Sequence, residues 1–126
     1  MNGESRAQKA RQLVARKQLA EAIGLMNREE GGGGRRSHFL ARLTTAQLCL
    51  DGGKPTLALP ILEALDEDAR KHLLDDWEPS LCAEVIKSLL LCHKALGTGG
   101  DDERVRKLYG RLSTLDVLAA LSLDGK

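Results

Sequence analysis

The apolar residues of this chain are of few kinds, and this limits the fold more than any other feature. Among 126 residues there are 24 Leu and 14 Ala, against 4 Val, 3 Ile and one each of Phe, Trp and Tyr. Leu and Ala favour helices, whereas the β-branched and aromatic residues that favour strands are scarce. We therefore predict an all-α fold of about five to seven helices, and the length predicts a single domain over residues 1–126.

Glycines, prolines and capping residues divide the chain into helical segments. A run of four glycines predicts a loop over 30–36, Asp51-Gly52-Gly53 predicts a helix stop, and Pro60 predicts a kink. Asp76 and Asp116 are candidate N-caps, and Pro79 suits a first helical turn. The predicted helices cover residues 5–29 with a break near 15–18, then 37–50, 55–65, 69–74, 78–96, 101–113 and 117–123.

Two alanine pairs suggest an internal repeat at an offset of 36 residues. Ala10 and Ala22 in the first pair of helices correspond to Ala46 and Ala58 in the second. Small residues at this spacing let antiparallel helices approach closely, as in the tetratricopeptide pattern with its period of about 34. The alternative is coincidence in Ala- and Leu-rich helices. Both interpretations predict stacked antiparallel helical hairpins.

The segment 79–96 is more apolar than a surface helix needs to be. On a helical wheel its apolar residues cover an arc of roughly 200°, and Leu91 lies within the remaining polar arc. Either this helix is central to the domain, or another molecule covers its second side. Trp77 precedes it and is either an interface anchor or a core residue. The candidates for self-association are Trp77, Leu81, Val85, Leu89 and Leu91.

No residue pattern points to catalysis, a cofactor or a metal. Cys82 and Cys92 lie about 15 Å apart along one helix, and the histidines show no metal-binding spacing. The acidic residues around Asp66 are explained by caps and solubility. Buried thiols and ordinary histidines are expected, and the odd number of cysteines suits a reducing compartment.

The charge balance argues against a nucleic-acid partner, and the lack of a long apolar run argues against membrane insertion. The net charge of +1 divides into +5 over residues 1–42, −6 over 43–85 and +2 over 86–126. Such alternation suits contacts between helices or between copies, or else simply solvated faces. No apolar run approaches the roughly 20 residues of a membrane span, and no secretory signal is visible at the charged and polar N-terminus.

Short motifs in the second half carry a family resemblance. Trp77-Glu78-Pro79 opens a long apolar helix that continues with Leu81 and Glu84, and the last stretch holds Arg111-Leu112 and Leu115-Asp116. In these motifs the chain resembles the C-terminal domain of TssA (ImpA/VasJ-type) proteins of the bacterial type VI secretion system. Val117 stands where the family usually has Pro.

The resemblance implies a non-enzymatic assembly factor of the bacterial cytoplasm. TssA-like C-terminal domains self-associate into rings and work with baseplate, tube and sheath proteins. Family members also have an N-terminal domain, so we expect this chain to be the C-terminal part of a longer protein. The alternative function is a monomeric tetratricopeptide-like adaptor that binds a peptide or a helix.

Overall fold

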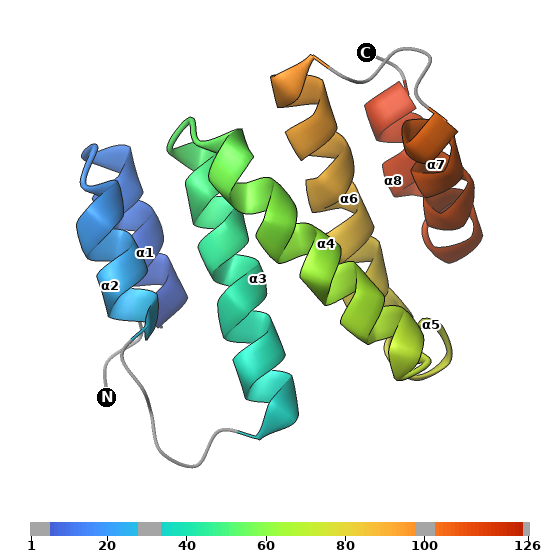
Figure 1. Cartoon of the computed structure of the whole chain (residues 1–126), viewed down its shortest axis with the longest axis horizontal. Coiled ribbons are helices and arrows are strands. Elements are labelled where there is room, and N and C mark those ends of the chain that lie inside the picture. Colours follow the sequence, from blue (N-terminus) through green and yellow to red (C-terminus); the bar gives the residue numbers. More distant parts are fainter. Residues whose placement is uncertain (1–5, 28–33, 98–102, 125–126) are drawn as a thin grey trace. The chain divides into compact units, whose positions relative to one another are not determined.

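The computed structural model describes residues 6–27, 34–97 and 103–124, and these residues form eight helices and no strand. The all-α prediction is confirmed. The helices number one more than the upper end of our expectation, because the four-residue α5 stands as a helix of its own. In chain order they are α1 (Arg6–Ala15), α2 (Leu19–Asn27), α3 (Arg35–Asp51), α4 (Pro55–Lys71), α5 (Leu74–Trp77), α6 (Pro79–Leu96), α7 (Glu103–Leu115) and α8 (Val117–Asp124) (Figure 1).

The chain divides into two compact units. The first unit ends at Ile61 and the second begins at Leu62, so α4 contributes to both. The prediction of one domain over residues 1–126 stays a prediction. Most of the predicted Gly-rich loop over 30–36 lies outside the described residues, and α3 begins at Arg35 within its expected end.

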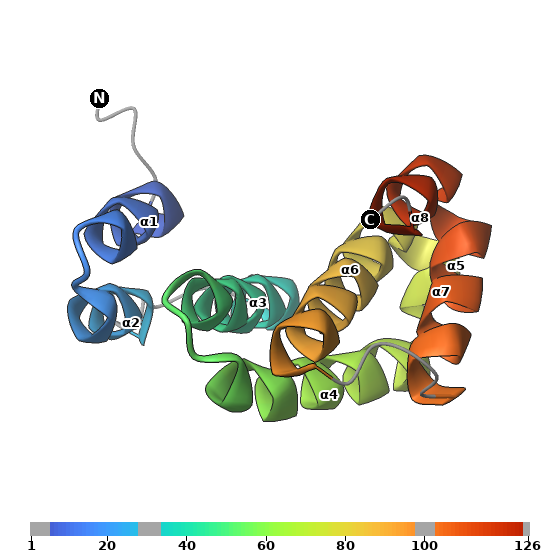
Figure 2. The same cartoon turned by 90° about the horizontal axis from the view of Figure 1, so that it is seen from above.

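The first helical hairpin has the break that its sequence predicts. Lys17 has a left-handed backbone with φ of 63°, and the N–H of Gln18 donates to the carbonyl oxygen of Leu13 over 2.8 Å. This turn reverses the chain, so α1 and α2 run antiparallel and side by side (Figure 1, Figure 2).

The alanines of the suggested repeat are all buried. Ala10 from α1 and Ala22 from α2 belong to one core cluster with Met26 and with Leu48 from α3. The close approach of α1 and α2 that their spacing predicts is therefore present. Ala46 and Ala58, the corresponding alanines, are also fully buried.

Gly52 and Gly53 end α3, as the sequence predicts. The N–H of Gly52 donates to the carbonyl oxygen of Leu48 over 2.9 Å, and Gly53 has a φ of 78°, which glycine adopts at little cost. A Cβ added at Gly52 would come within 2.9 Å of Cδ2 of Leu19. The glycine thus also allows α2 to lie close to the end of α3.

Helix α4 is longer than predicted. We expected it to end at Leu65, with a second short helix over 69–74, but it continues through Pro60 to Lys71. The physical reason is a buried stripe at helical spacing, which outweighs the cost of the proline. The buried side chains on this stripe are Ala58, Leu62, Leu65, Asp66 and Ala69.

A left-handed residue, Leu73, separates α4 from the short α5. The prediction that Asp76 caps the long apolar helix is wrong, because Asp76 lies inside α5 and Glu78 occupies the N-cap position without a side-chain cap. Pro79 is the first residue of α6, as expected, and Gly97 ends this helix with a φ of 77°.

In the second unit, α6, α7 and α8 follow one another as antiparallel neighbours (Figure 1, Figure 2). The expected narrow stripe of α7 is buried, with Val105, Leu108 and Leu112 turned inward. Oδ1 of Asp116 accepts a hydrogen bond of 3.0 Å from the N–H of Ala119, so the predicted cap of α8 is present.

Candidate interaction surface

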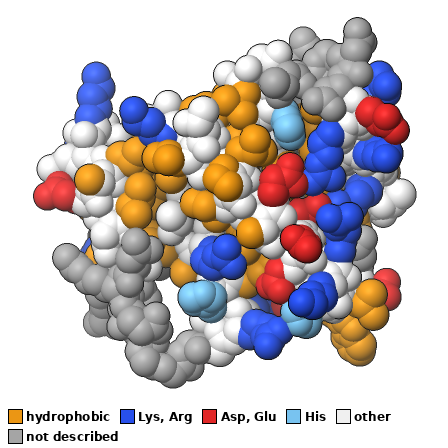
Figure 3. Space-filling view, viewed as in Figure 1, with side chains coloured by type: hydrophobic (Ala, Val, Ile, Leu, Met, Phe, Trp, Pro, Cys, Tyr) orange, Lys and Arg blue, Asp and Glu red, His pale blue; other side chains and the backbone are white. Residues whose placement is uncertain are grey.

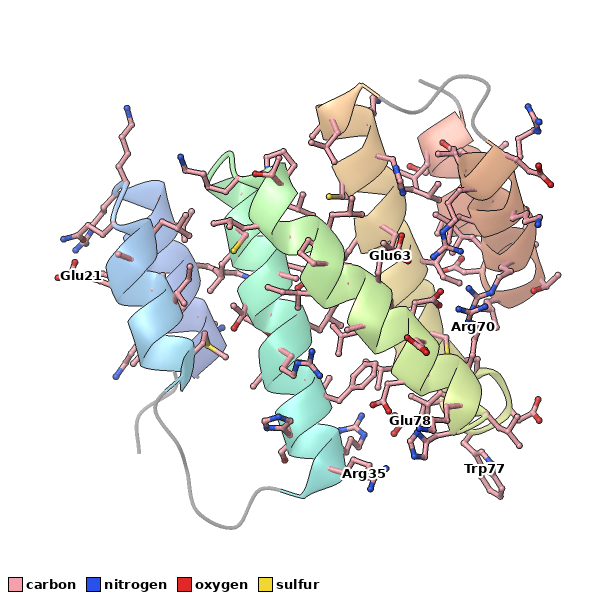
Figure 4. All side chains as sticks on the ribbon, in the orientation of Figure 1. Glu21, Arg35, Glu63, Arg70, Trp77 and Glu78 are labelled. Carbon is pink, nitrogen blue, oxygen red and sulfur yellow. The ribbon has the colours of Figure 1, made fainter. Side chains whose placement is uncertain are left out.

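Trp77 lies on the surface of the second unit. Its side chain is 77% exposed, so the alternative that placed it in the core is wrong. Leu73, which directly precedes α5, is also exposed. We call Leu73 and Trp77 the α5 patch. Figure 4 shows Trp77 pointing away from the neighbouring helices, and Figure 3 shows hydrophobic side chains at this end.

Other side chains of the same chain cover the wide apolar face of α6, so no second molecule is needed to bury it. Leu81, Val85 and Leu89 are buried, which favours the central-helix interpretation and corrects their selection as surface candidates. A helix covered by neighbours on two sides needs apolar residues over a wide arc. Leu91 is 45% exposed, as its place in the polar arc predicts.

Helix α8 exposes a second group of apolar side chains. Val117, Leu118 and Leu121 are each more than 60% exposed, whereas Ala120 of the same helix is buried. Positions i, i+1 and i+4 share one side of a helix. We call these three residues the α8 patch. The sequence reasoning missed it, although a short helix that is apolar all round was its signal.

A buried ionic cluster holds α7 against α4 in the second unit. The carboxylate of Asp66 is 1% exposed and accepts hydrogen bonds from Nη1 of Arg111 at 2.9 Å and Nη2 of Arg104 at 3.3 Å. Arg70 adds a longer ion pair at 3.7 Å, and Glu63 binds Arg104 as well. Acidic and basic side chains intermingle beside α7 in Figure 3.

The electrostatics of this cluster follow from its partners. Partial burial alone would lower the pKa of Arg104, but the hydrogen bonds and charges of Glu63 and Asp66 raise it above its ordinary value. Assigning Asp66 to caps and solubility was wrong. It lies on the buried stripe of α4, four residues after Leu62, and this position was the signal that could have revealed it.

The other residues of the sequence motifs build the fold. Leu112 is in the core, Leu115 is half-buried, and Asp116 caps α8. Glu84 pairs with Lys87 at 2.8 Å on the partly exposed side of α6. Of the motif residues, Trp77 is the one with a large apolar side chain on the surface.

The three cysteines are buried and form no disulfide. Burial raises the pKa of the Cys49 thiol, and burial together with the charge of Glu63 raises the pKa of the Cys92 thiol. Within residues 6–27, 34–97 and 103–124 there is no group of His, Cys, Asp and Glu side chains arranged to hold a metal ion. No helix in the same ranges is long and apolar enough to cross a membrane.

The described residues thus form an all-α fold of packed helical hairpins that exposes apolar side chains at α5 and α8. Comparison with known protein families shows which family the chain belongs to. A family model described as "Type VI secretion, EvfE, EvfF, ImpA, BimE, VC_A0119, VasJ" matches residues 2–89. The chain therefore belongs to this type VI secretion family.

A solved structure titled "EAEC T6SS TssA-Cterminus" has the same fold, with a TM-score of 0.78 and 26% sequence identity. The match covers 95% of this chain and 98% of that chain. A search of curated proteins found no match. The resemblance to TssA-type C-terminal domains is thus confirmed, and the family is a structural component of type VI secretion.

Proposed function

We propose that this chain is a self-associating structural domain, without enzymatic activity, that forms rings in the bacterial cytoplasm. As a domain of a longer protein it organises the baseplate, tube and sheath proteins of the type VI secretion system while these assemble. The observation that carries the proposal is the exposed apolar surface of the second unit, made of the α5 patch and the α8 patch.

These patches have the chemistry of a contact between proteins. Exposed apolar side chains gathered on one element mark interaction sites more often than scattered ones do. Burying a large apolar side chain contributes about 1.5–3 kcal/mol, so the five side chains of the two patches offer enough to offset much of the entropy lost on association. In a closed ring the same contact repeats around the axis, so each copy makes this contact with both of its neighbours.

The alternative is a monomeric adaptor that binds a peptide or a helix. One observation favours it, a groove on the first hairpin lined by Leu13, Glu21, Gly24 and Leu25. The size of the particle in solution separates the two functions, because an adaptor needs no second copy.

Light scattering after gel filtration tests the proposal. We expect a discrete assembly many times heavier than 13.7 kDa, and a chain that stays at 13.7 kDa at high concentration would contradict self-association. Leu118→Glu combined with Leu121→Glu should reduce the assembly while helicity is retained. Leu57→Glu, the same change at an exposed leucine of α4 outside both patches, is the matched control.

A further inference from the structure

The groove on the first hairpin lies between α1 and α2. Leu13 of α1 and Glu21, Gly24 and Leu25 of α2 line a volume of about 390 Å³. Gly24 leaves it open, since a Cβ added there would meet no atom within 4 Å. Glu21 supplies the carboxylate of the lining and is labelled on this hairpin in Figure 4.

The lining predicts the kind of side chain that the groove accepts. Leu13 and Leu25 are half-buried and offer apolar walls, while the Glu21 carboxylate can accept a hydrogen bond. A tryptophan combines a large apolar ring with one N–H donor that seeks an acceptor when it is buried. An indole therefore matches both parts of the groove.

Charged residues stand on and near the groove, where Glu21 lines it and two basic residues follow Leu13 in the chain. The turn after α1 holds Arg16 and Lys17, which are exposed, and the backbone N–H of Arg16 donates to the carbonyl oxygen of Leu13 over 3.1 Å. This turn therefore lies next to Leu13, a residue of the lining. Trp77 is flanked by the acidic Asp76 and Glu78, which are opposite in charge to Arg16 and Lys17.

We propose that the groove between α1 and α2 receives Trp77 of a second copy of this chain. The proposal rests on the proposed self-association and names the two surfaces that meet. Trp77 is the single tryptophan of the chain and is 77% exposed, so it is available to such a partner. The groove belongs to the first unit and Trp77 to the second, so this contact joins two different surfaces. Such heterologous contacts close into rings when the rotation between copies allows it.

The fluorescence of the single tryptophan tests the contact directly. As the concentration of the chain rises, the emission of Trp77 should shift to shorter wavelength and its quenching by iodide should fall, because the indole leaves water. An unchanged emission in a sample that light scattering shows to be assembled would overturn this contact and leave self-association standing. A sample that stays monomeric would overturn both.

A substitution that fills the groove identifies the second surface. Gly24→Leu places a side chain in open space on α2 and should abolish the concentration-dependent shift while helicity is retained. Gly110→Leu is the matched control, an exposed helical glycine of α7 with equal space around it, and should behave as the unchanged chain does. An emission shift in the Gly24→Leu variant as large as that of the unchanged chain would overturn the proposal.

Mixing two variants tests whether the contact is heterologous. Trp77→Ala should weaken association at least about 30-fold, as expected for a central tryptophan, and Gly24→Leu should weaken it similarly. A Trp77→Ala copy keeps its groove and a Gly24→Leu copy keeps its tryptophan, so the mixture should regain one contact and the emission shift. A mixture with no shift would contradict the pairing.

Discussion

Nη1 of Arg111 donates a hydrogen bond to Oδ1 of Asp66 over 2.9 Å, although 45 residues separate them in the chain. Arg111 belongs to the motif that carries the family resemblance, and Asp66 is 1% exposed. The motif arginine therefore acts within the fold, where it joins α7 to α4.

Asp66→Ala should lower the free energy of unfolding by about 3 kcal/mol, because it leaves two arginines without their buried partner. This expected loss lies at the low end of the range for broken buried ion pairs, because Arg104 and Arg111 are partly exposed to solvent. Urea unfolding followed by circular dichroism measures it. Glu103→Ala, which removes the exposed pair with Lys107, should cost less than about 1 kcal/mol. Equal effects of the two variants would contradict the role of the cluster.

Leu89→Asp and Leu91→Asp should differ sharply, although both lie on α6. Leu89 is fully buried, so a carboxylate there should cost more than about 3 kcal/mol and unfold much of the protein. Leu91 is 45% exposed, and its variant should keep the helical signal. Far-UV circular dichroism with thermal melting measures both, and a folded Leu89→Asp variant would show that α6 is not central.

The same glycine substitution should have opposite effects at two positions. Gly97→Ala forces a left-handed backbone on a residue with a Cβ and should destabilise by about 1 kcal/mol. Gly24→Ala lies inside α2 with open space around it and should stabilise by about 1 kcal/mol. Thermal melting of the two variants beside the unchanged chain tests the contrast. If both variants shift the melting temperature in the same direction, the backbone conformation described for Gly97 or for Gly24 is contradicted.

The buried thiols should react slowly in the folded protein. Burial raises the pKa of Cys49 and of Cys92, and each unit of increase lowers the reactive thiolate fraction about tenfold. Mass spectrometry after brief iodoacetamide treatment should find little alkylation at neutral pH, and rapid alkylation in denaturant. Equal rates in the two states would show that the thiols are accessible.

The same raised pKa values predict a loss of stability at alkaline pH. The unfolded thiols ionise near about pH 8.5, whereas the folded protein keeps them protonated. Their contribution to stability is therefore complete below that pH and declines as the pH rises toward the folded pKa values. Urea midpoints measured from pH 7 upward should decrease, and replacing Cys49 and Cys92 with Ala should flatten this dependence.

Much of the fold could be predicted because its signals are local. The break around Lys17, the stops at Gly53 and Gly97, the first turn at Pro79 and the cap at Asp116 each depend on the backbone preference or side chain of a few adjacent residues. Such preferences act within one helical turn, so they can be read without knowing which helices meet.

Only the tertiary structure decided which side chains are covered. Pro60 is a local signal to bend or end a helix, yet α4 continues because its stripe is buried. Asp66 is buried because arginines from α7 reach it, and Trp77 is exposed at the end of α5 although a long apolar helix follows it. The sequence by itself determined that this chain is helical and where most helices begin and end. Burial and ion pairing depend on residues distant in the chain, so the roles of Asp66, Leu89 and Trp77 were decided by packing.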